Sequence, residues 1–251
     1  MAVKKEGVVA DDNSVGRKLR KVVFAVSQAF CAFSFIRLLR KKLISCALLA
    51  LLTMLLLCIP MLVERYMNCH ICLPVYLFLM VYAMGSLLGD GYDLYHLTKW
   101  WDKFMHLSSG VLFAMFGAFL MHRMSNGIQQ PILLKALFAV LFSVAIAAIW
   151  EIFEYAADMI FHADMQNDTL IHEINSYLIG PKMGQIGHIE QINSVQINGQ
   201  MMQGYIDIGL IDTMRDMIIE TLGAVVYAVV FALDRDKHPI FQPLSMESKT
   251  A

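Results

Sequence analysis

The chain has 251 residues, of which 58% are hydrophobic and 16% carry charged side chains. Soluble domains are about half apolar and about one quarter charged, so this composition predicts an integral membrane protein whose main partner is the lipid bilayer. The formal net charge of −1 at pH 7 argues against nucleic acid as a partner, because nucleic-acid binding relies on a strongly basic surface.

Residues 1–42 form a basic N-terminal segment around a short apolar run. Residues 1–21 are polar and basic, residues 22–36 are apolar, and residues 37–42 carry four basic side chains. A spanning helix needs about 20 residues, so the short run is either an interfacial helix or a short span. By the positive-inside rule, an interfacial helix places the acidic residues described below on the cytoplasmic face, and a span moves them to the outer face.

Five longer apolar runs predict membrane-spanning helices. These runs are residues 43–63, 71–89, 104–122, 132–150 and 208–233, and the helical pattern of the fourth continues to residue 161. We therefore expect an all-α fold, a polytopic transmembrane bundle of five or six spans. The bundle covers residues 43–233, and a polar tail follows at residues 234–251.

A polar insertion at residues 162–207 separates the last two runs. It is rich in Gln and Asn and contains five glycines. The β-prone segment 195–197 is followed by Asn198 and Gly199, and both of these residue types accept the positive φ angles of a tight hairpin turn. The sequence therefore predicts a small β-hairpin outside the bilayer.

Eight ionisable side chains recur at helical spacing at the ends of three consecutive spans. They are Asp102, His106, Glu151, Glu154, Asp158, Asp212, Asp216 and Glu220. Within each span the spacing is three, four, seven or eight residues, so each set lies on one stripe of its helix. Consecutive spans run in opposite directions, so the start of one, the end of the next and the start of the last share one membrane face. We expect the set, apart from Asp158, to converge around one polar pocket.

Two of these carboxylates lie deep in the last span. Counting about 20 residues back from Leu233 reaches Met214, so Asp216 and Glu220 lie below the membrane interface. A charged side chain at mid-bilayer costs roughly 2.5–3.5 kcal/mol. These two side chains must therefore face the bundle or a wet cavity.

Crowded carboxylates repel one another and require cations or protons. A set of carboxylates with one histidine suits a divalent metal ion such as Mn, Mg, Fe or Zn, which would activate water against a phosphate ester of a lipid. The candidate metal ligands are His106, Glu154, Asp158, Asp216 and Glu220. The candidate catalytic residues are Asp102, His106, Glu151, Glu154, Asp212 and Asp216.

Three other interpretations fit the same pattern. Crowding and burial raise carboxylate pKa values, so protonated side chains would serve proton coupling or acid-base chemistry. The cluster would also recognise a cationic ligand or head group. The third interpretation involves no functional site: charged side chains at the span ends are solvated by the lipid head groups or form ion pairs that hold helices together. The nearest basic residues in the sequence are Lys103 and Arg215.

Small residues recur on the same spans. They are Ser108, Ser109, Gly110, Gly117 and Gly223. Small side chains let membrane helices approach closely, so we expect these residues to serve helix contact rather than catalysis.

Three segments carry a family resemblance. They are WWDKFMHLSSG at 100–110, AAIWEIFEYAADMIFHADMQ at 147–166 and GYIDIGLIDTMRDMIIETLGA at 204–224. Over about residues 75–233 they resemble the uncharacterised bacterial membrane-protein family typified by YjdF, and more distantly the VanZ family, which is linked to teicoplanin resistance. The chain lacks the Glu-x-x-Gln and arginine features of VanZ. The resemblance implies a multi-pass protein of the bacterial plasma membrane and supplies no reaction.

These observations predict an integral membrane protein with an acidic, histidine-containing site at one membrane face. The first hypothesis is metal-dependent processing or binding of a lipid or envelope precursor through a lipid-linked or polar head group. The alternatives are an ion- or proton-coupled transporter and a non-enzymatic membrane protein.

Overall fold

The structure is a computed structural model that describes residues 14–125, 128–234 and 244–246. The chain divides into two compact units. Unit 1 comprises residues 1–144 and 220–251, and unit 2 comprises residues 145–219. The two units are described in turn.

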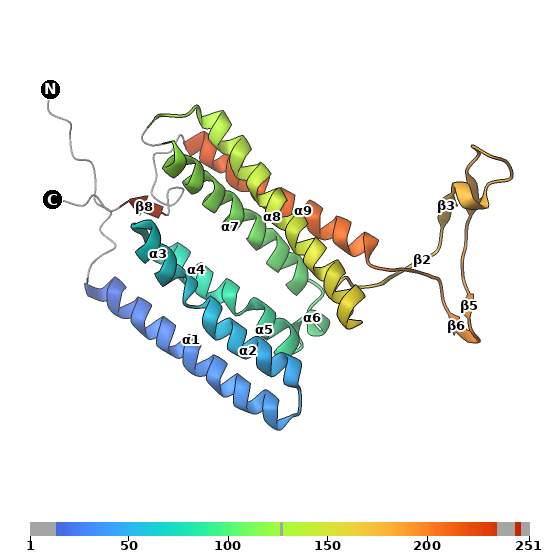
Figure 1. Ribbon diagram of the computed structural model, residues 1–251, viewed down its shortest axis with the longest axis horizontal. Helices are drawn as coiled ribbons and strands as arrows, with labels where there is room; N and C mark the ends of the chain where they lie inside the picture. The colour runs from blue at the N-terminus through green and yellow to red at the C-terminus, as the bar shows by residue number, and fades with distance from the viewer. Residues whose placement is uncertain (1–13, 126–127, 235–243, 247–251) are drawn as a thin grey trace. The chain divides into compact units, whose positions relative to one another are not determined.

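Unit 1 is a bundle of α-helices (Figure 1). Its helices are α1 (Ser14–Arg40), α2 (Ile44–Leu56), α3 (Ile59–Met67), α4 (Leu73–Ala83), α5 (Gly85–Gly91), α6 (Leu94–Leu97) and α7 (Trp101–Met124), with the first part of α8 (Ile132–Phe161) and the last part of α9 (Leu210–Asp234). The starts of α3 and α4 agree with the positions of two prolines. Pro60 and Pro74 lie in the first turns of these helices, where no backbone N–H is needed. Asn68, with φ of 47°, ends α3 in the left-handed conformation.

Six helical segments of the described chain have the length and hydropathy of membrane spans. They are Val15–Arg40, Ile44–Met67, Leu73–Gly91, Trp101–Met124, Ile132–Phe161 and Leu210–Asp234. The predicted polytopic helical bundle is confirmed. The apolar run 22–36 is the middle of the longer helix α1, because the polar residues on either side of it continue the helix.

Two buried apolar clusters form the interior of unit 1. One joins α7 to the parts of α8 and α9 in this unit, and the other joins α1, α2, α4 and α5. Side chains of α4 contact both clusters, since Tyr76 and Met80 belong to the second while Phe78 and Tyr82 lie against the first. Helix α4 therefore connects the two halves of the bundle.

Helix α7 makes backbone contact with its neighbours through glycine. A Cβ atom on Gly110 would overlap the backbone oxygen of Glu220 in α9, and a Cβ on Gly223 would overlap the backbone oxygen of Leu107 in α7. Ser143 of α8 donates to the carbonyl oxygen of Gly110 at 3.2 Å. These contacts fit the expectation that the small residues serve close helix approach.

A polar network at the start of α1 links four elements of unit 1. The Arg20 guanidinium lies 2.9 Å from the Glu64 carboxylate of α3 and 4.9 Å from the ring centroid of Tyr76 in α4. It also donates to the carbonyl oxygen of Ile71 in strand β1 (Cys69–Ile71). The guanidinium at this end of α1 is thus paired with an acidic partner.

Strand β1 pairs antiparallel with β8 (Leu244–Met246). Of the predicted polar tail at residues 234–251, the structure describes strand β8 and Asp234, which ends α9. The first 13 residues of the predicted N-terminal segment lie outside the described residues.

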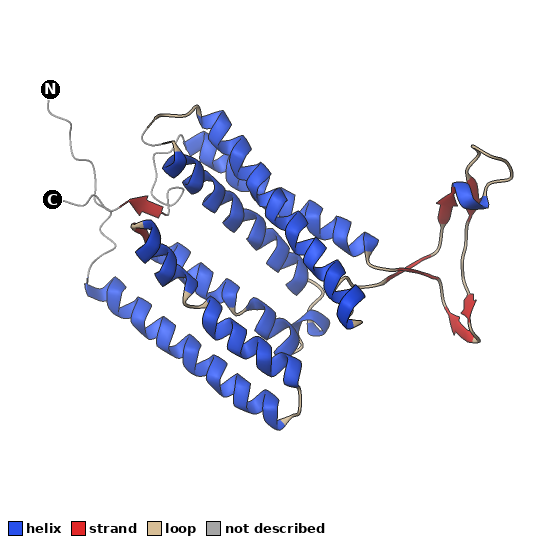
Figure 2. Cartoon of the chain, in the orientation of Figure 1, coloured by secondary structure: helices blue, strands red, loops and turns tan. Residues whose placement is uncertain are grey.

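Unit 2 contains the last part of α8, the polar insertion and the first part of α9. The strands of the insertion pair antiparallel as β2 (Thr169–Ile171) with β7 (Tyr205–Asp207), β3 (Ile174–Ser176) with β4 (Gly187–Ile189), and β5 (Val195–Ile197) with β6 (Gln200–Met202). A short 3₁₀ helix, η2 (Tyr177–Ile179), follows β3. Figure 2 shows these short strands in red between α8 and α9.

The predicted hairpin is confirmed at β5 and β6. Asn198 and Gly199 form its turn with φ angles of 48° and 89°, as the sequence signal requires. The pairs β2–β7 and β3–β4 carry no such two-residue signature, because longer connections join their strands.

The contact at Gly110 provides a test of the helix arrangement. Gly110→Ala should lower the thermal unfolding temperature in detergent, because the added methyl group overlaps the backbone of α9. Overpacking of this kind typically costs about 1–3 kcal/mol. Gly184→Asn is the control, since Gly184 lies in open space at a positive φ that asparagine tolerates. Equal melting of Gly110→Ala and wild type would show that α7 and α9 do not touch here.

Candidate functional site

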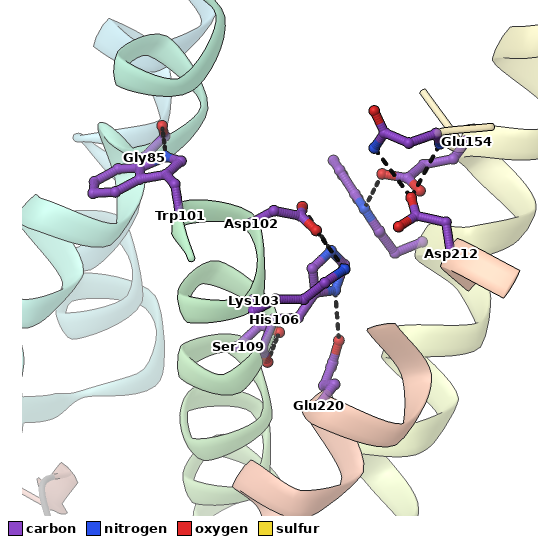
Figure 3. Close-up of polar contacts among 11 residues, drawn as sticks. Gly85, Trp101, Asp102, Lys103, His106, Ser109, Glu154, Asp212 and Glu220 are labelled. Atoms are coloured by element: carbon purple, nitrogen blue, oxygen red, sulfur yellow. Dashed lines mark hydrogen bonds and ion pairs between the residues drawn. The ribbon is translucent and has the colours of Figure 1, made fainter. Parts of the chain in front are cut away.

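The first turn of α7 is anchored to α5. The Trp101 indole N–H donates to the carbonyl oxygen of Gly85 at 3.1 Å (Figure 3). A Cβ on Gly85 would overlap the side chain of Met105, so α5 and α7 lie in close contact one turn further on. This anchoring fixes the backbone that carries Asp102 and His106.

His106 lies between two carboxylates of unit 1. Its Nε2 atom lies 3.5 Å from Oδ1 of Asp102, one turn earlier on α7. Its Nδ1 atom lies 4.0 Å from Oε2 of Glu220 on α9, as Figure 3 shows. His106 is 9% exposed and Glu220 is 3% exposed, so this part of the cluster is shielded from solvent. Each ring nitrogen therefore faces one carboxylate.

Three further side chains balance and extend this cluster. The Lys103 ammonium lies 2.8 Å from Oδ2 of Asp102 and offsets its negative charge. Ser109 donates to the backbone oxygen of His106 at 2.8 Å. The Tyr82 side chain of α4 lies close to Ser109 and Glu220. Helices α4, α7 and α9 therefore all contribute to the cluster.

Sequence reasoning did not identify Tyr82 as a site residue and assigned Ser109 to helix contact alone. Tyr82 is one of many apolar or aromatic residues in its span, and no motif separates it from them. Its place beside Ser109 follows from how α4 crosses α7, which spacing within one helix does not reveal.

The acidic residues of α8 lie in unit 2. The Trp150 indole N–H donates to Oε1 of Glu154 at 2.7 Å. Glu154 and Glu151 are 9% and 6% exposed. A buried carboxylate needs donors or cations to be stable, and Trp150 supplies one such donor to Glu154.

Two other carboxylates of unit 2 organise the chain that follows α8. The two oxygens of Asp158 accept the backbone N–H groups of Met165 and Gln166 at 2.7 and 2.9 Å. Asp212 accepts the backbone and side-chain N–H groups of Asn167 at 3.0 and 3.1 Å. Both residues therefore have a direct part in shaping the start of the insertion.

The structure thus brings together Asp102, His106 and Glu220 in unit 1. The other predicted site residues lie in unit 2. They are Glu151, Glu154, Asp158, Asp212 and Asp216. Of these, Asp216 is 2% exposed. The convergence of the whole set in one pocket stays a prediction. Because α9 is continuous, Asp216 lies one turn before Glu220 on the same stripe of that helix.

The fold and these buried polar groups define a polytopic α-helical membrane protein. A family model described as "Predicted membrane protein (DUF2238)" matches residues 20–237. The match covers most of the chain, so the protein belongs to this family, which is consistent with the resemblance to the YjdF type. No curated protein and no solved structure matches the chain. The distant resemblance to VanZ stays a prediction.

The role of Asp158 provides a test of the geometry after α8. Asp158→Asn replaces one of the two acceptor oxygens by an amide group, so at least one of residues 165 and 166 should lose amide-hydrogen protection in hydrogen exchange. Asp168→Asn is the control, because Asp168 is exposed. Unchanged protection at residues 165 and 166 in Asp158→Asn would contradict the assigned hydrogen bonds.

Proposed function

We propose that this protein binds or processes the polar head group of a lipid or envelope precursor at the Asp102–His106–Glu220 cluster. The supporting observation is His106, a buried imidazole whose two ring nitrogens face carboxylates from two membrane helices. Buried ionisable groups in membrane helices typically mark functional sites, because their burial is costly. The cellular location under this proposal is the bacterial plasma membrane.

A divalent metal ion is the cofactor that best fits the donor set. One imidazole and several carboxylates suit Mn, Fe, Zn or Mg. His106 and Glu220 would supply ligands, and Asp216, one turn before Glu220 on α9, extends the same stripe. Such an ion would supply Lewis-acid activation of water or a phosphate oxygen. Glu154 and Asp158 remain further proposed ligands.

The protein's own residues have separate roles in this scheme. Asp102 orients the His106 ring through Nε2, and Lys103 offsets the charge of Asp102 by direct contact. In the form of this proposal that has no metal ion on the ring, His106 exchanges a proton with the bound head group as a general acid-base catalyst, since a metal-bound ring nitrogen cannot do so. Glu151, Glu154, Asp212 and Asp216 complete the proposed set of catalytic residues.

We infer that this site faces the outer side of the membrane, which follows if the start of α1 is cytoplasmic. Three of the six spans precede α7, so the start of α7 and the start of α1 lie on opposite faces. Six basic side chains lie at the start of α1 or before it (Lys4, Lys5, Arg17, Lys18, Arg20, Lys21) and four at its end (Arg37, Arg40, Lys41, Lys42), which favours a cytoplasmic N-terminus. An outward-facing site fits an envelope precursor as ligand.

One observation favours a second function, proton-coupled transport. Asp102, His106 and Glu220 form a carboxylate–imidazole–carboxylate series across two helices. Such chains carry protons in membrane pumps and transporters. In this alternative the cluster passes a proton rather than holding a metal ion.

Metal content of the purified protein separates these functions. Elemental analysis should find a bound divalent metal in the wild type, with a loss in His106→Asn and Glu220→Gln. His96→Asn is the matched control, because His96 also pairs with an aspartate, Asp93 at 2.6 Å, but is exposed.

A wild type without bound metal would overturn the metal-dependent function. If Glu220→Gln then abolished proton flux in liposomes, transport would be the better account. If both variants only melted at lower temperature, the cluster would be structural.

A further inference from the structure

Arg37 is held in a fixed position near the end of α1. Its guanidinium carbon lies 4.7 Å from the ring centroid of Tyr92, the residue that ends α5. The Tyr92 ring stacks on Phe30 at 5.5 Å, and its hydroxyl lies 2.8 Å from Oγ of Ser34. Phe30, Ser34 and Arg37 all belong to α1, so α1 itself fixes the aromatic ring under the cation.

The charge of Arg37 has no acidic partner among the described residues. Its Nη1 atom is buried and makes no hydrogen bond with any residue that the structure describes. The Arg37 side chain as a whole is half-buried, so an anion at the accessible part of the guanidinium would pair with its charge.

Arg20 provides an internal comparison on the same helix. It also lies over a tyrosine ring, that of Tyr76 at 4.9 Å. Unlike Arg37, it has a carboxylate, Glu64, at 2.9 Å and a backbone acceptor in Ile71. Among the described residues, the same cation–aromatic arrangement is therefore paired with a carboxylate at one end of α1 and not at the other.

The position of Arg37 along α1 indicates which anion is available. Helix α1 has 27 residues, so it is about 40 Å long at 1.5 Å per residue. That length matches the bilayer including its head groups, and Arg37 lies one turn from the helix end. The exposed basic residues Arg40, Lys41 and Lys42 follow directly. If α1 spans the bilayer, Arg37 lies at the depth of lipid phosphates, beside a basic segment whose charge attracts anions.

We propose that Arg37 is the centre of a binding site for the phosphate group of an anionic membrane lipid. A planar guanidinium offers paired N–H donors that match two phosphate oxygens, and the Tyr92 ring holds that plane in place. Arg40 and Lys41 contribute long-range attraction rather than a fixed contact. The site is separate from the Asp102–His106–Glu220 cluster and does not depend on the function proposed for it.

Lipid retention measures this site directly. The full-length protein is mixed with dioleoyl phosphatidic acid or with phosphatidylcholine, and bound lipids are counted by native mass spectrometry. Wild type and Arg40→Gln should retain phosphatidic acid, while Arg37→Gln should bind it roughly tenfold more weakly because a charge-assisted hydrogen bond is lost. Both variants remove one positive charge at the same end of α1.

Equal weakening in Arg37→Gln and Arg40→Gln would overturn the proposal, because surface charge would then account for binding. If Arg37→Gln fails to fold, phenylglyoxal labelling of the wild type replaces it. Phosphatidic acid vesicles should protect Arg37 from labelling and leave Arg40 reactive. Protection by inorganic phosphate alone would identify a free-phosphate site and overturn the lipid as ligand, and no protection by either would overturn the site.

Discussion

The backbone contact between α7 and α9 is the constraint on which the candidate site depends. Lipid tails are as apolar as leucine, so helices in a bilayer associate through close van der Waals contact and not through a hydrophobic driving force. Gly110 and Gly223 allow that contact, because a Cβ at either position would overlap the facing backbone. The same contact brings Glu220 beside His106. Two glycines without chemistry of their own thus position the ionisable pair.

Charge balance then defines what the cluster accepts. With both carboxylates ionised, Asp102 and Glu220 would contribute two negative charges and Lys103 one positive charge, so the cluster would carry −1 with a neutral His106 (−2 + 1) and 0 with a protonated one. Charges in low-dielectric surroundings interact strongly, so the cluster favours one additional positive charge. A proton on His106 or part of a metal ion's charge would supply it. Metal binding and proton transfer are therefore two consequences of one electrostatic arrangement.

The features that can be predicted from the sequence alone are those determined by residues close together in the chain. The spans follow from apolar runs, and the β5–β6 hairpin follows from Asn198 and Gly199. The full length of α1 does not follow from the sequence, because both ends of the helix are polar and carry no apolar signal. Tyr82 beside Ser109 and Arg37 over Tyr92 depend on how helices distant in the sequence cross, so no local pattern reveals them.

The central claim is that Glu220 of α9 lies against the His106 imidazole. Nitrogen-15 NMR of histidine-labelled protein in lipid nanodiscs tests it, with the His106 signals assigned by their loss in His106→Asn. The account predicts that Glu220→Gln shifts the ring-nitrogen resonances of His106, whereas Glu173→Gln shifts those of His188, its neighbour at 3.8 Å, and leaves His106 unchanged. Unaltered His106 resonances in Glu220→Gln would contradict the account.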